Sequence, residues 1–121
     1  MKLQVDFPYL EQYRKKFKVT DRTIFAYNKE IYSNYELSED LLLHEIKHIE
    51  QQNRIGADLW VEKYLNNRQF RLNEEVEAYQ AQLAFIKDRN QRYKLKILCA
   101  KTLSSDLYGN IITFDKALKL L

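Results

Sequence analysis

Residues 38–53, SEDLLLHEIKHIEQQN, form the stretch of sequence that decides the fold. Ser38 can cap a helix through its hydroxyl, and the next two residues, Glu39 and Asp40, are acids that complement the helix dipole in a first turn. Residues 53–56, which end in Gly56, are typical of a helix end. The sequence therefore predicts a helix from Ser38 to about Asn53.

Residues 44–48 of this helix read His-Glu-Ile-Lys-His, an HExxH motif. Residues four apart lie on one helix face, with their Cβ atoms about 5–6 Å apart. His44 and His48 can therefore both reach one Zn²⁺ at about 2.0–2.1 Å. Glu45 would project beside the metal, where it can polarise a water without binding the ion. The chain has 2 histidines, both in this motif, which further favours a metal site.

A third ligand must come from elsewhere in the chain, because a catalytic zinc usually takes three protein ligands and no third histidine exists. The candidates are a carboxylate, Cys99 or a rarer group. The best acidic cluster is NEEVEAY at residues 73–79, at the start of a predicted helix. Acids favour such a position for the helix dipole alone, but with HExxH upstream they become the favoured source of the ligand. Cys99 is expected to be a small buried hydrophobe.

The rest of the chain is predicted to be mostly helical with one short β-hairpin. The predicted helices cover residues 7–18 with Pro8 in the first helical position, 58–65, 73 to 88 or 89 with Asn73 as its cap, 93–103, and a terminal segment capped by Thr113. Strands are expected at 23–27 and 31–33, a loop at 66–72 and a turn at 108–110. Trp60 and Tyr64 share a helix face and should pack against the HExxH helix.

Composition limits the class of protein. The 121 residues favour a single domain, 1–121, and the 2 Gly and 1 Pro argue against a turn-rich all-β fold. One cysteine cannot form an internal disulfide, and neither a signal peptide nor a membrane-spanning run is visible, so a cytoplasmic protein without a membrane partner is expected. The net charge of +3, from 20 basic and 17 acidic residues, is mild for a dedicated nucleic-acid binder.

Three segments, HEIKHIEQQ, DLWVEKYL and NEEVEAYQAQ, together resemble the small gluzincin-type zinc metallopeptidases, minimal HExxH-plus-Glu proteins of bacterial and phage genomes. The resemblance covers about residues 41–83. It implies an α+β, zincin-like core in which a short sheet lies against the HExxH helix. It also implies that His44 and His48 are zinc ligands and that Glu45 is the catalytic base. The first Glu of an ExEA motif, Glu75, would be the third ligand, with Glu77 as the main alternative.

The function that this resemblance implies is zinc-dependent hydrolysis of a peptide or protein substrate. Larger relatives often carry an Asp where this chain has Tyr79, an Asp that can orient a ligand histidine; Glu77 or a backbone carbonyl could do so here instead. Tyr79 and Tyr108 could donate to an oxyanion, but packing is the favoured role of both.

Two other functions stay open on the sequence alone. The chain could be a zincin-fold protein that binds zinc and acts as an interaction module without significant peptidase activity. It could also be a basic, nucleic-acid-associated protein with a chance HExxH. Zinc content separates the last hypothesis from the others.

Overall fold

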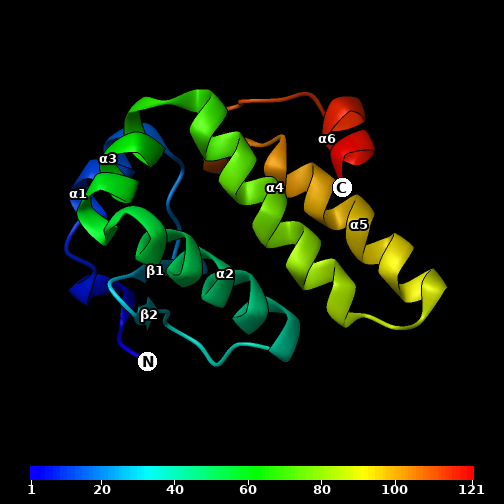
Figure 1. The fold of residues 1–121 in the computed structure, drawn as a ribbon, viewed down its shortest axis with the longest axis horizontal. Helices are drawn as coiled ribbons and strands as arrows, with labels where there is room; N and C mark the ends of the chain where they lie inside the picture. Colours follow the sequence, from blue (N-terminus) through cyan, green and yellow to red (C-terminus); the bar gives the residue numbers. More distant parts are fainter.

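The computed structural model describes all residues, 1–121, and has a mostly helical α+β fold with one small antiparallel sheet (Figure 1). Its elements in chain order are η1 (Gln4–Asp6), α1 (Leu10–Lys16), β1 (Phe25–Tyr27), β2 (Glu30–Tyr32), α2 (Glu39–Ile55), α3 (Ala57–Asn66), α4 (Arg68–Phe85), α5 (Arg89–Leu103), η2 (Asp106–Tyr108) and α6 (Phe114–Leu120). The predicted mixture of many helices and one hairpin is therefore confirmed. No helix has the length and the apolar composition needed to cross a bilayer.

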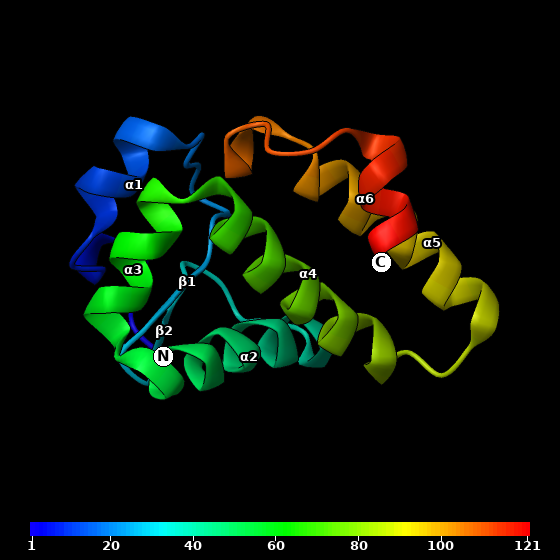
Figure 2. The same cartoon turned by 45° about the horizontal axis from the view of Figure 1, so that its top comes forward.

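The two long helices α2 and α4 pack along each other and form the centre of the molecule (Figure 1). At one end, α1, α3 and the hairpin cover an aromatic core that contains Phe7, Phe25 and Trp60. At the other end, α5 and α6 cover a second core that contains Leu83 and Leu103 (Figure 2). The contact between α2 and α4 therefore lies between two separate hydrophobic cores.

The hairpin lies against α2 and is fixed there by the side chain of Gln52. The Gln52 amide donates to the carbonyl oxygen of Ala26 at 2.7 Å and accepts from the N–H of Asn28 at 3.0 Å. This agrees with the expectation of a small sheet beside the HExxH helix. The sheet pairs Phe25 with Tyr32, Ala26 with Ile31 and Tyr27 with Glu30.

Strand β1 is shorter than predicted, since it begins at Phe25 rather than Thr23, and β2 begins one residue earlier than predicted because the turn is tighter. Asn28 and Lys29 alone make the connection, with φ values of 49° and 69°. A two-residue hairpin loop needs positive φ at both positions, and Asn tolerates this better than most residues. Glu30 therefore belongs to β2, although the pattern placed it in the turn.

The start of α2 agrees with the sequence, but its cap works differently. Ser38 is the N-cap residue and Glu39 and Asp40 lie in the first turn. The Ser38 hydroxyl donates to the Asp40 carboxylate at 2.6 Å and accepts no backbone N–H. The helix runs to Ile55, two residues beyond the predicted end near Asn53, and its C-cap is Gly56, whose φ of 96° suits glycine.

The prediction for the start of α4 is wrong. The helix begins at Arg68, inside the predicted loop at 66–72, and Asn67 rather than Asn73 is its cap, accepting the N–H of Phe70 at 2.9 Å. Both asparagines can cap a helix, so tertiary contacts decide. The earlier start places the ring of Phe70 against Trp60 and buries Arg71.

Other helix ends also differ from their predictions. Helix α1 is confined to Leu10–Lys16, so Pro8 lies before the helix rather than in its first position. Helix α4 ends at Phe85, and α5 starts at Arg89 because the Asp88 carboxylate caps it through the N–H of Gln91. The terminal helix and its Thr113 cap are confirmed.

Candidate metal centre

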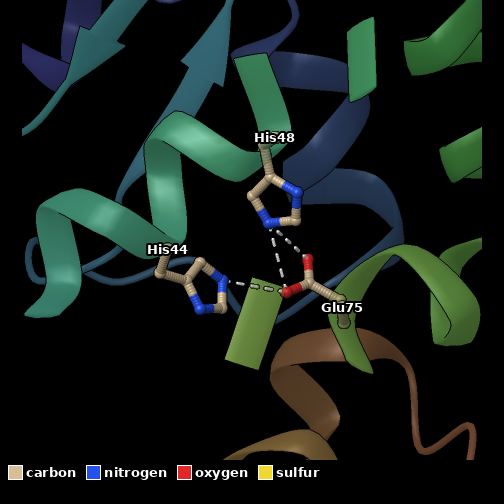
Figure 3. A group of neighbouring side chains, drawn as sticks. All are labelled: His44, His48 and Glu75. Atoms are coloured by element: carbon tan, nitrogen blue, oxygen red, sulfur yellow. Dashed lines mark hydrogen bonds and ion pairs between the residues drawn. The ribbon is translucent and has the colours of Figure 1, made fainter. Parts of the chain in front are cut away.

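Three side chains predicted as metal ligands meet between α2 and α4. His44 and His48 lie one turn apart on α2, and both imidazoles point at the carboxylate of Glu75 on α4 (Figure 3). Nε2 of His44 lies 3.1 Å from Glu75 Oε1, and Nε2 of His48 lies 3.2 Å from the same oxygen. All three residues are buried, and their ligand atoms lie within 4.8 Å of one another.

A glutamine side chain determines which ring nitrogen of each histidine carries the proton. Nδ1 of His44 contacts Gln82 Oε1 at 3.1 Å, while the Gln82 amide nitrogen donates to the Asp40 carboxylate at 2.8 Å. Because a carboxylate can only accept, the amide nitrogen must face Asp40 and the amide oxygen must face the histidine. Nδ1 of His44 therefore carries a proton, which leaves Nε2 as the atom that can bind a metal.

The same arrangement occurs at the second histidine. Nδ1 of His48 contacts Gln51 Oε1 at 2.8 Å, and the Gln51 amide nitrogen donates to the backbone carbonyl of Glu74 and to the Glu77 carboxylate, both at 3.0 Å. These two partners are acceptors, so His48 also carries its proton on Nδ1 and directs Nε2 toward Glu75. Glu77 thus orients a histidine only through Gln51.

Three electron-pair acceptors consequently converge on one point, namely the two Nε2 atoms and Glu75 Oε1. Acceptors about 3 Å apart repel each other unless a cation lies between them. A tetrahedral site with ligand bonds of about 2.0–2.1 Å has edges of about 3.3 Å. The nitrogen–oxygen separations of 3.1 and 3.2 Å are close to that edge, so the group could hold a metal ion.

Charge holds the group together in the absence of metal. Burial by itself would raise the pKa of Glu75, but the charge of His48 and its hydrogen bond to this carboxylate hold that pKa well below its usual value. Burial would lower the pKa of His48, yet the Glu75 carboxylate raises it to about 9. The charged form of His48 carries a second proton on Nε2, between His48 and Glu75. A metal ion would have to displace this proton in order to bind.

Glu45, the predicted catalytic base, lies beside this group without joining it. Its side chain is largely buried, with a carboxylate oxygen 3.9 Å from Nε2 of His44, and it lines the cleft described below. Burial raises its pKa above the usual value for a glutamate. Glu45 is thus a carboxylate outside the His44, His48 and Glu75 group that could exchange a proton with a small molecule in the cleft.

The group lies in a cleft of about 300 Å³. His44, Glu45, His48 and Glu75 line this cleft, and most of its other walls are apolar. The walls come from α1, β1 and α5, with Phe17, Phe25, Leu95 and Leu98 among them. Tyr79 and Tyr108 also line it, joined by a hydrogen bond of 2.7 Å between their hydroxyls.

The structure also gives the positions of the aromatic, cysteine and acidic side chains that the sequence singled out. Trp60 and Tyr64 are buried as expected, and the Trp60 ring lies 5.3 Å from that of His48 on α2. Cys99 is buried and outside the group. Glu77 is also outside the group, since its carboxylate contacts Gln51 and, at 3.4 Å, Arg54.

The sequence predictions missed the residues that orient the group, Gln51, Gln82 and Tyr64. Tyr64 donates its hydroxyl proton to Oε2 of Glu75 at 2.5 Å. Helical spacing offered a signal, because Gln51 follows His48 by three residues and Gln82 follows Glu75 by seven. Each glutamine therefore lies on the same helix face as a ligand candidate.

Comparison of the chain with models of known protein families, with curated proteins and with solved structures finds no match. The class of site is therefore defined by its own geometry, a buried His–His–Glu group that could hold a metal ion in a cleft.

Proposed function

We propose that this chain is a zinc-dependent hydrolase of peptide bonds, a minimal zincin-like protein of the gluzincin type. The observation that carries the proposal is the position of the Glu45 carboxylate, which lines the cleft beside the His44, His48 and Glu75 group, 3.9 Å from Nε2 of His44. A carboxylate in that position can reach both the proposed metal site and a molecule in the cleft. It suits a general base better than a structural element.

The number of ligand candidates supports a catalytic site rather than a structural one. Structural zinc sites are closed by four protein ligands, whereas catalytic sites have three and keep one position open. Three side chains converge here, and the site borders a cleft. The two imidazoles and one carboxylate form a ligand set used by catalytic zinc.

Each residue has a definable task in this proposal. Zn²⁺, when bound, lowers the pKa of a coordinated water from 15.7 to about 7 and polarises a carbonyl group. His44, His48 and Glu75 hold the ion, while Gln82 and Gln51 keep the histidine protons on Nδ1. Glu45 accepts the water proton and returns it to the leaving amine, and burial raises its pKa toward the range that this exchange requires.

The test replaces Glu45 by glutamine, which keeps the shape of the side chain and removes the base. We expect E45Q to retain about one zinc per chain and a normal circular dichroism spectrum. Cleavage of a fluorescence-quenched peptide library should fall about 10²- to 10⁴-fold, the usual contribution of general acid–base catalysis. Zinc content is measured by mass spectrometry on the same samples.

Other outcomes identify the alternatives. Wild-type protein that binds zinc but cleaves no peptide in a broad library would favour a zinc-binding interaction module over a peptidase. Loss of zinc from E45Q would mean that Glu45 supports the metal directly. Wild-type protein that contains no zinc after purification and takes up none would contradict the proposal.

A further inference from the structure

The two carboxylate oxygens of Glu75 have different partners. Oε1 lies between the two histidine nitrogens, whereas Oε2 accepts the hydroxyl proton of Tyr64 at 2.5 Å. Oε2 is nevertheless only 3.2 Å from Nε2 of His48, so both oxygens are within reach of the point where a metal would bind. The hydrogen bond from Tyr64 is the contact that distinguishes them.

We propose that Tyr64 is a positioning residue that restricts Glu75 to one metal-binding oxygen, an inference that rests on the zinc site proposed above. Carboxylates bind metals through one oxygen or through both. A phenol that donates to Oε2 competes with the metal for that oxygen, so Oε1 is left as the ligand atom. The side of the site that faces the cleft and Glu45 then stays open for water and substrate.

The ring of Tyr64 is held in place by its neighbours. It is buried on α3 and lies between two aromatic rings, that of Trp60 at 4.8 Å and that of Tyr13 at 5.7 Å, with interplanar angles of 21° and 15°. Packing on both faces prevents the phenol from turning away from Glu75.

The backbone of Tyr64 is held as well. Arg71 is buried one helical turn before Glu75 on α4, and its guanidinium donates to the carbonyl oxygen of Tyr64 at 2.5 Å. The same guanidinium donates to the carbonyl oxygen of Tyr108 at 3.1 Å. Helix α4 thus contacts Tyr64 at both its carbonyl and its hydroxyl, which aligns the phenol with the Glu75 carboxylate.

The experiment compares Co²⁺-loaded wild-type protein with the variants Y64F and Y13F. Y64F removes the hydroxyl that contacts Glu75 and keeps the ring. Y13F removes the hydroxyl of the adjacent buried ring, which has no hydrogen bond to Glu75, and serves as the matched control. Circular dichroism first verifies that each variant is folded, and the visible spectrum and affinity of Co²⁺ are then measured.

We expect four-coordinate Co²⁺ with strong visible absorption in wild type and in Y13F. Y64F should show the weaker absorption of five-coordinate Co²⁺, because Glu75 then binds through both oxygens. Its Co²⁺ affinity should fall about 10- to 100-fold, as is typical when a residue that orients a ligand is lost. A wild-type spectrum and affinity in Y64F would overturn the inference.

A crystal structure of zinc-loaded wild-type protein gives a second measurement that needs no variant. One Glu75 oxygen at about 2.0–2.2 Å from the zinc, with Tyr64 still on the other, is the expected result. Two bonded oxygens would overturn the inference and leave the zinc site intact. Failure of wild-type protein to bind either metal would overturn the proposed function and this inference with it.

Discussion

Glu75 and Glu77 lie two positions apart on α4 and have different environments. A step of two residues turns a helix by about 200°, so the two side chains leave on different faces. Glu75 is buried against both histidines, whereas Glu77 is partly exposed and contacts Gln51 and Arg54. The helix geometry thus brings one acid of the ExEA motif, Glu75, to the two histidines of the candidate metal centre.

We expect Glu75→Ala to lower zinc affinity strongly, because it removes one of the three proposed ligands. Glu77→Ala should lower it far less, since Glu77 acts on His48 only through Gln51. Titration of each metal-free variant with zinc against a competing chelator measures the difference. A variant E77A without zinc, next to a zinc-binding E75A, would show that the assignment of the ligand is wrong.

The pKa of His48 predicts how the stability of the metal-free protein depends on pH. Folding raises its pKa from 6.5 to about 9 through the charge of Glu75, although burial opposes this. A group whose pKa is raised by folding stabilises the protein below the unfolded pKa, and this contribution is lost as pH rises through the folded pKa. The free energy of unfolding should therefore fall between pH 6.5 and 9.

We expect that fall to be about 1–3 kcal/mol larger in wild type than in His48→Gln, which cannot titrate in this range. Urea denaturation in the presence of a chelator, at pH 6, 7.5 and 9, measures it. Parallel pH profiles of the two proteins would contradict the assignment of a charged His48 in the metal-free state.

At the scale of elements, side chains of three residues, Trp60, Tyr64 and Arg71, form hydrogen bonds that join α3 to α4. The indole N–H of Trp60 donates to Glu74 at 3.0 Å, the phenol of Tyr64 donates to Glu75, and Arg71 donates to the Tyr64 carbonyl. The contact of Arg71 comes from the part of α4 that precedes residue 73. The early start of α4, capped by Asn67, is therefore part of what positions Glu75.

Substitution of two asparagines tests at which residue α4 starts. Asn67→Ala removes the cap and should cost about 1 kcal/mol of unfolding free energy. Asn73→Ala should cost less than about 0.5 kcal/mol, because Asn73 is exposed and contacts only the Gln69 side chain at 2.8 Å. Thermal unfolding of the two variants measures the difference. The reverse order of costs would place the start of the helix at Asn73.

At the scale of the whole molecule, the candidate metal centre joins α2 to α4 between the two hydrophobic cores. A metal ion there would bind the folded chain and not the unfolded one, because the ligands come from residues 44, 48 and 75. Metal binding should therefore stabilise the entire domain rather than one helix.

Zinc at a free concentration 100 times its Kd should add about 2.7 kcal/mol to the free energy of unfolding and raise Tm by several degrees. A chelator should reverse the shift. The double variant H44A/H48A serves as the control and should show no zinc-dependent shift in Tm. An equal shift in that variant would indicate that zinc stabilises the protein at another place.

The sequence allowed much of the candidate site to be predicted, for local reasons. His44, Glu45 and His48 belong to one helix, and helical spacing alone places both histidines on one face. The cap of the terminal helix at Thr113 and the end of α2 at Gly56 were also predictable, because they depend on neighbouring residues.

Tertiary structure alone decided the features that depend on contacts distant in the chain. The choice between Asn67 and Asn73 as a cap depends on Phe70 and Arg71 packing against α3 and η2. The roles of Gln82 and Tyr64 depend on contacts with His44, 38 residues away, and with Glu75, 11 residues away. Local propensity carries no information about such contacts, because their free energy arises only when the two helices have packed.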